Sequence, residues 1–289
     1  MKSLLVLVAL FFVACAAGPD LPSSQATHGD LAQVQLLMDK ANAALAAATK
    51  REDIAPTLKL YEDVLALAPD HKEALVNAAM LRFMHGNDVL TENDKDARLA
   101  TWLKGREYGL RALGQNPTFR AAYEKDNDMA KQTALLGEQD ALAMLWTGLN
   151  WAKWGELYGI IRAAIDIPKV KALLDRTNEV APKSHCGGAD RFFMGYWVVI
   201  PGFAGRDPKK AVAAYEHAMS LSPECMPAHN VTQARYYAKD AEDQAMFTSL
   251  LQKAIDAPED PPGSIVRLVN NLARTEAKEL MTKTKEFFE

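Results

Sequence analysis

Tyr61–Asp70 (YEDVLALAPD) and Tyr215–Glu224 (YEHAMSLSPE) share one pattern, and this pattern predicts a helical fold. In each stretch, apolar residues follow the tyrosine at spacings of three and four, which places them on one face of a helix. Each stretch then reaches a proline, a residue that ends one helix and fits the first turn of the next. Both stretches therefore predict a pair of helices joined at a proline.

The helix-closing proline recurs at positions 69, 117, 182, 223 and 258. The last two steps, 41 and 35 residues, are close to the roughly 34-residue period of tetratricopeptide repeats, and the earlier steps require insertions. Neighbouring helix pairs of this kind bury their apolar faces by stacking. We predict an all-α, tetratricopeptide-like helical repeat solenoid that forms a single domain over residues 30–289. The alternative is an irregular helical bundle.

One short segment looks like a strand. Tyr196–Ile200 is a run of aromatic and β-branched residues that ends at Pro201. Because it continues the helical pattern of Arg191–Met194, we interpret it as the end of a buried helix.

The N-terminus has the features of an export signal. Lys2 precedes the apolar run Leu4–Phe12, which is too short to span a bilayer, and Val13-Ala14-Cys15 resembles the lipobox of bacterial lipoproteins. This predicts a signal peptide over 1–14, lipidation at Cys15 and a flexible tether over 15–29. The alternative is an ordinary secretory signal in which Cys15 is discarded. Ala16, rather than Asp, favours the outer membrane by resemblance to enteric sorting rules.

Charge and cysteine content limit the possible partners. The formal net charge is −4 at pH 7, which argues against nucleic acid as a partner. If Cys15 is lipidated, Cys186 and Cys225 are the remaining pair, and in an oxidising envelope they could form a disulfide. The alternative is two free buried thiols.

Catalytic and metal-binding motifs are absent from the sequence. It contains no nucleophile elbow, no phosphate-binding glycine-rich loop and no His-Glu-x-x-His. His185 and Cys186 are adjacent, but one such pair does not supply the ligands of a zinc site. We therefore expect no enzyme activity, no metal site and no cofactor.

An aromatic stripe is the first candidate for a binding site. Trp146, Asn150, Trp154 and Tyr158 are four residues apart and share one helical face, with Trp151 beside them. Such a stripe could line a pocket in which aromatic walls hold an apolar ligand and the amide orients its polar end. The alternative is a helix core with a hydrogen-bonded asparagine.

A second aromatic run supplies the remaining candidates for ligand binding. Phe192 and Tyr196 lie in this run, and Phe203 lies in the loop that follows it. The hypothesis is that both runs face one cavity.

Several segments together resemble the T component associated with TRAP transporters. They are Cys186–Tyr196 with its Gly-Gly turn, Ile200–Asp207 with its Pro-Gly-Phe loop, Lys210-Ala211, and the helix that ends at Leu221-Ser222-Pro223. The end of the chain, from Phe247 to Met281, is similar to that family as well.

The resemblance implies a periplasmic lipoprotein of helical repeats. Members are expected to form trimers, to carry a hydrophobic pocket or pore and to dock the solute-binding protein of a TRAP system, and no catalytic residues carry over. We predict an accessory of TRAP-type solute uptake, lipid-anchored on the periplasmic side of the envelope, that binds a small apolar or amphipathic organic ligand. The alternative is a helical-repeat scaffold for an envelope complex without ligand binding.

Overall fold

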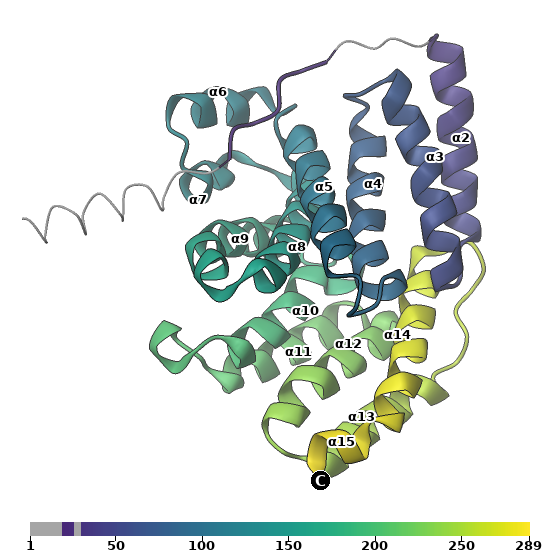
Figure 1. The fold of residues 1–289 in the computed structure, drawn as a ribbon, viewed down its shortest axis with the longest axis vertical. Helices are drawn as coiled ribbons and strands as arrows, with labels where there is room; N and C mark the ends of the chain where they lie inside the picture. Colours follow the sequence, from purple (N-terminus) through teal and green to yellow (C-terminus); the bar gives the residue numbers. More distant parts are fainter. Residues whose placement is uncertain (1–18, 26–29) are drawn as a thin grey trace, which may run out of the picture. The chain divides into compact units, whose positions relative to one another are not determined.

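The computed structural model describes residues 19–25 and 30–289, and this part of the chain contains helices and no strand. The prediction of an all-α fold is confirmed. The α-helices, drawn in Figure 1, are α2 (Leu31–Ala47), α3 (Ile54–Leu67), α4 (Lys72–Met84), α5 (Lys95–Leu113), α6 (Pro117–Lys125), α7 (Met129–Gln132), α8 (Ala141–Tyr158), α9 (Ile160–Val180), α10 (Ser184–Val199), α11 (Pro208–Leu221), α12 (Met226–Gln233), α13 (Gln244–Asp256), α14 (Ile265–Thr282) and α15 (Thr284–Phe288).

The chain divides into two compact units, and a single domain over residues 30–289 stays a prediction. The first unit comprises the described residues up to Asn42 together with Ile54–Ala181. The second comprises Ala43–Asp53 and Pro182–Glu289. Each unit has its own set of fully buried side chains, so each can be described by itself.

Helix α8 is the centre of the first unit. It packs against α9, α5 and α4, and three tryptophans in this region, Trp102, Trp146 and Trp151, are at most 2 % exposed. Glycines allow α5 to come very close to α8: a Cβ added at Gly109 would lie 2.1 Å from Thr147 Oγ1. The close packing of α5 on α8 therefore depends on small residues at the contact.

The second unit is built on α10–α14. Helix α10 packs against α11, and α12 packs against both α13 and α14. Its core includes Phe193, Ala218, Phe247 and Leu268, which are at most 6 % exposed. The strand-like segment at 196–200 is helical up to Val199, as interpreted, but Val199 is 63 % exposed, so this helix end is not fully buried.

The two stretches with the shared pattern form similar helix pairs. Pro69 lies in the turn between α3 and α4, and Pro223 lies in the turn between α11 and α12. The tyrosine of each pair donates its hydroxyl to an asparagine: Tyr61 to Asn42 Oδ1 on the preceding helix α2 at 2.6 Å, and Tyr215 to Asn230 Oδ1 within its own pair, on α12, at 2.8 Å. A π-helical turn follows the second helix of both pairs.

All five prolines lie within two residues of a helix end, so the helix boundaries predicted from them are confirmed. A tetratricopeptide-like solenoid is a further claim about how the pairs stack, and it stays a prediction.

Residues 19–25, predicted as part of a flexible tether, make hydrogen bonds to other residues of the first unit. Tyr123 Oη donates to the carbonyl oxygen of Pro19 at 2.6 Å, and Ser24 Oγ donates to Asp70 Oδ2 at 2.7 Å. The predicted signal peptide and Cys15 lie outside the described residues.

Candidate functional site

The first half of α8 is part of the core. Trp146 is 2 % exposed and Asn150 is 0 % exposed. The Asn150 amide Nδ2 donates to the carbonyl oxygens of Ala79, on α4, and of Trp146, at 2.9 and 2.8 Å. A buried amide with two such bonds joins two helices. Of the two interpretations that the sequence left open, hydrogen-bonded core describes this half of the helix.

The second half of α8 approaches the surface. Trp154 is half-buried and stacks on Tyr158, with ring centres 4.8 Å apart and planes 28° apart. The Tyr158 residue is 61 % exposed, whereas Trp151 is 0 % exposed. The stripe predicted from the sequence therefore divides into a core part and a surface part.

The helix ends at Gly159, whose φ of 148° is a conformation that side-chain-bearing residues rarely adopt. This turn lets α9 start at once and fold back onto α8. It leaves two consecutive apolar residues, Ile160 and Ile161, 76 and 77 % exposed. Together with Tyr158 they form an exposed apolar corner, which we call the α8–α9 corner.

Cationic side chains lie against the tryptophans of this half. The Arg106 guanidinium Cζ is 5.1 Å from the Trp151 ring centre and 4.9 Å from the Trp154 ring centre. Arg162 Cζ lies 5.4 Å from the Trp154 ring centre. These distances are within the range of cation–π attraction, so the second half of α8 combines aromatic and positively charged groups.

The second aromatic run lies in the second unit. Phe192 and Tyr196 stack with ring centres 5.5 Å apart, and both are partly exposed on α10. Phe203 lies in the 3-10 turn Gly202–Ala204 and is 95 % exposed. Ligand binding by these three residues, and a cavity shared with the first run, stay predictions.

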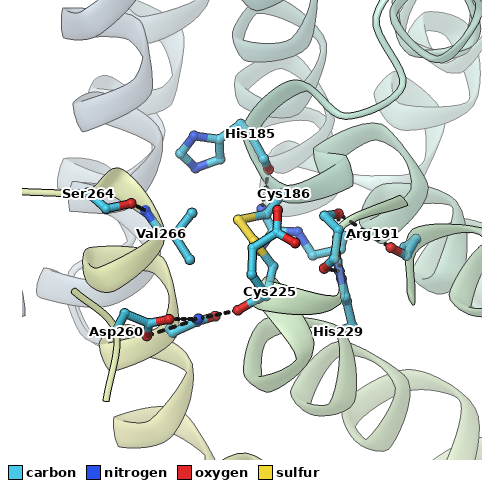
Figure 2. Close-up of a disulfide and its surroundings, with 12 residues drawn as sticks. His185, Cys186, Arg191, Cys225, His229, Asp260, Ser264 and Val266 are labelled. Carbon is cyan, nitrogen blue, oxygen red and sulfur yellow. Dashed lines mark hydrogen bonds between the residues drawn. A yellow bond between two sulfur atoms is a disulfide. The ribbon is translucent and has the colours of Figure 1, made fainter. Parts of the chain in front are cut away.

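A disulfide joins Cys186 at the start of α10 to Cys225 before α12, with the two Cα atoms 5.6 Å apart (Figure 2). The backbone there is left-handed at His185, Cys186 and Gly187, with φ of 46°, 59° and 57°. The first two are strained because they carry side chains. Arg191 Nη2 donates to the His185 carbonyl at 3.1 Å, so a charged hydrogen bond and the disulfide both hold this turn.

His229 lies beside the disulfide in Figure 2 and is 0 % exposed. Burial, helped by the positive charge of Arg191, lowers the pKa of His229 to about 4, although the Ser222 carbonyl acts in the opposite direction. The ring is therefore neutral at neutral pH. Its Nε2 lies 3.0 Å from the Ser222 carbonyl oxygen, to which it can donate a hydrogen bond. We therefore interpret the disulfide, Arg191 and His229 as structural support for the left-handed turn at Cys186.

A family model for the TRAP transporter T-component matches residues 48–288, nearly the whole chain. The chain belongs to the TRAP transporter T-component family. No curated protein matches it significantly. T-components are accessory components of a transport system and are not a known enzyme family. The family membership suggested by the sequence segments is thus confirmed.

Two features are absent from the described part of this T component. No helix there has both the length and the apolarity needed to cross a bilayer. The same residues contain no cluster of three or more His, Cys, Asp or Glu side chains suited to a metal ion.

Sequence reasoning missed a pocket of the T component in the second unit. It is a shallow, open depression of about 420 Å³ among α11, α12 and α13, with Tyr215, Met219, Met226 and Pro258 among its lining residues. The spacing of Tyr215 and Met219 indicated a helix face, but the pocket depends on α13, which no local pattern pairs with them.

Sequence reasoning also missed the charged groups around α8. Asp166 and Lys169 on α9 are 1 and 4 % exposed, and Arg106 comes from α5. A charge four residues after Arg162 is typical of a solvated helix face, so the sequence offered no reason to expect these groups in the interior. Only the packing of α5 and α9 on α8 brings them together.

Proposed function

We propose that this T component is a lipid-anchored accessory of a TRAP-type solute uptake system that docks the solute-binding protein and binds a small amphipathic organic ligand. Family membership supports the transport role. The observation that carries ligand binding is the second half of α8, where Trp154 and Tyr158 stack at the edge of an exposed apolar corner. Apolar surface of this kind marks interaction sites in soluble domains.

The proposal includes tetratricopeptide-like stacking of the helix pairs, a homotrimeric state and an anchor at Cys15 in the envelope, with the outer membrane favoured. The anchor is tested by Cys15→Ser. Loss of the lipid should release the protein from the membrane fraction, because the described helices provide no spanning segment. A variant that sediments with membranes to the same extent as wild type would contradict the lipid anchor.

Ligand binding is tested with a neutral amphiphile, dodecyl maltoside, below its micelle concentration. We expect binding to quench tryptophan fluorescence and Trp154→Ala to weaken the affinity about tenfold, as expected when a large aromatic contact is lost. Leu142→Ala is the matched control, because Leu142 is 44 % exposed on the same helix but at its other end. Equal affinities in all three proteins would remove α8 from the proposed ligand site.

Docking of the solute-binding protein is proposed to involve the exposed Phe203 loop, because an aromatic side chain that is 95 % exposed is suited to insertion into a partner. A photo-reactive phenylalanine analogue at Phe203 should crosslink to the solute-binding protein in intact cells. The same analogue at Leu31, which is 76 % exposed on α2, is the control. Crosslinking at neither position, with normal expression, would contradict docking through this loop.

The scaffold without a ligand is the second candidate. It is favoured if dodecyl maltoside does not bind while the solute-binding protein still crosslinks.

A further inference from the structure

Three cationic side chains surround two tryptophans of α8. Besides Arg106 and Arg162, Lys169 Nζ lies 5.9 Å from the Trp151 ring centre. Lys169 is 4 % exposed, which is rare for a lysine unless it is paired. The two indole faces attract these cations, and this attraction offsets part of the cost of burying them.

The Asp166 carboxylate is already hydrogen-bonded to two of these cations. Asp166, which is 1 % exposed, accepts from Arg162 Nε at 2.6 Å and from Lys169 Nζ at 3.2 Å. The three cations and one anion leave two positive charges in excess. Burial, as the largest cause, lowers the pKa of Arg106; Asp166 and Glu107 oppose this shift and Arg162 adds to it. The Glu107 carboxylate lies 3.1 Å from Lys104 Nζ in an exposed ion pair.

Several buried N–H groups at this place have no acceptor among the described residues. They are Nε and Nη1 of Arg106 and the indole Nε1 of Trp151. Buried donors are almost always hydrogen-bonded, and leaving the donors of a cation buried and unpaired is unfavourable. The indole faces do not satisfy these donors, because ring faces attract positive charge without replacing an oxygen acceptor at each N–H.

We infer that Arg106 and Trp151 form the head-group site for an amphipathic organic anion whose apolar part lies along Trp154, Tyr158 and the α8–α9 corner. The inference rests on the proposed function, because it names the ligand class for the same part of α8. The head is an oxyanion, carboxylate or phosphate. A guanidinium presents its donors in a planar fork that matches such oxygens, and an indole N–H adds a third donor.

The inference explains why the two halves of the site differ in polarity. Arg106, Lys169 and Trp151 supply the charge and the buried donors, whereas Tyr158 and Ile161 supply exposed apolar surface. A ligand with one charged end and one apolar end matches both. A fully apolar ligand would leave the Arg106 and Trp151 donors without acceptors.

Isothermal titration calorimetry with dodecanoate, dodecyl phosphate and the neutral dodecyl maltoside, each below its micelle concentration, tests the inference. We expect wild type to bind the two anions more tightly than the neutral probe. Arg106→Gln should weaken the binding of the anions about tenfold or more, the usual loss for a charged hydrogen bond, and leave that of the neutral probe unchanged. Trp151→Phe should weaken anion binding less, because it keeps the ring and removes one donor.

Arg98→Gln is the matched control. Arg98 lies on the same helix, α5, with its Cζ 4.9 Å from the Trp102 ring centre, but its Nε donates to the Gly86 carbonyl at 3.1 Å. Its replacement should leave anion affinity unchanged. If Arg98→Gln weakens anion binding as much as Arg106→Gln does, general charge attraction accounts for the binding and the site is overturned.

The remaining outcomes separate the inference from the proposed function. If dodecyl maltoside binds as tightly as the anions, or Arg106→Gln weakens all three probes equally, the anion inference fails and the ligand site stands. If none of the three probes binds, both the proposed ligand-binding function and the anion inference that rests on it are contradicted. A preference for dodecyl phosphate over dodecanoate indicates a lipid-type head, and the reverse preference indicates a free organic acid.

The melting temperature of Arg106→Gln provides a second, independent test. Because Arg106 is a half-buried cation whose Nε and Nη1 have no acceptor among the described residues, Arg106→Gln should keep or raise the melting temperature. A clear drop would mean that Arg106 has a structural role and would count against the inferred site.

Discussion

The two halves of α8 share one four-residue stripe but differ in burial. The first half places Trp146 and Asn150 in the core, where each is at most 2 % exposed, and the Asn150 amide is bonded to two carbonyl oxygens. The second half places a stacked Trp154 and Tyr158 at the surface, next to buried N–H groups that have no acceptor among the described residues. A regular four-residue spacing thus continues from a structural contact into a candidate binding site.

The difference comes from the neighbours. The first half is enclosed by α4 and α5, whose small residues allow close contact, as at Gly105 and Ala79. The second half lies against the start of α9, which turns back at Gly159 and leaves its first residues exposed. A stripe of aromatic residues therefore becomes core or surface according to which helices cover it.

The largest expected effect is on the buried half. Trp146→Ala should lower the free energy of unfolding by about 3–5 kcal/mol, because it removes a fully buried indole that contacts Phe83 and leaves a cavity. Urea denaturation followed by circular dichroism measures this. A loss below about 1 kcal/mol would mean that the first half is not the core part of the helix.

A smaller effect is expected at the contact between α5 and α8. In Gly105→Ala the new Cβ would lie 2.3 Å from Asn150 Oδ1, and the two hydrogen bonds of that amide prevent it from moving freely. We expect a loss of about 1–3 kcal/mol in the free energy of unfolding. The same urea experiment applies, and an unchanged midpoint would show that the contact is looser than the structure has it.

Trp154→Ala should cost only about 1 kcal/mol of stability, the typical effect of a substitution outside the core. Its main effect should be the loss of ligand affinity described above. Comparing it with Trp146→Ala under identical conditions sharpens the contrast between the halves. Equal losses of stability in the two variants would assign both tryptophans to the core.

The smallest effect is expected at Gly155, in the second half. A Cβ there would lie 3.5 Å from the nearest atom, Ala163 Cα, which is ordinary contact. Because alanine favours helix over glycine by up to about 1 kcal/mol, Gly155→Ala should stabilise the protein slightly. A rise of one or two degrees in melting temperature supports this, and a fall indicates that α9 packs on α8 more tightly here than the 3.5 Å distance implies.

Much of the fold could be predicted from the sequence because its signals are local. The spacing around Tyr61 and Tyr215, and the prolines that follow, determine where helices start and end. The residues of the aromatic stripe could be named for the same reason. Their burial could not, because it depends on which distant helices pack on α8. The approach of Arg106 and Lys169 to Trp151, and the left-handed turn at Cys186, likewise depend on long-range contacts.

Native mass spectrometry of the protein extracted from its own cells shows whether a ligand is bound at α8. We expect a small amphipathic anion bound to the wild-type protein and to Leu142→Ala, and its loss from Trp154→Ala and Arg106→Gln, with normal circular dichroism in all four proteins. Wild-type protein that carries no small molecule and yet copurifies with its solute-binding protein would contradict the ligand site and favour the scaffold.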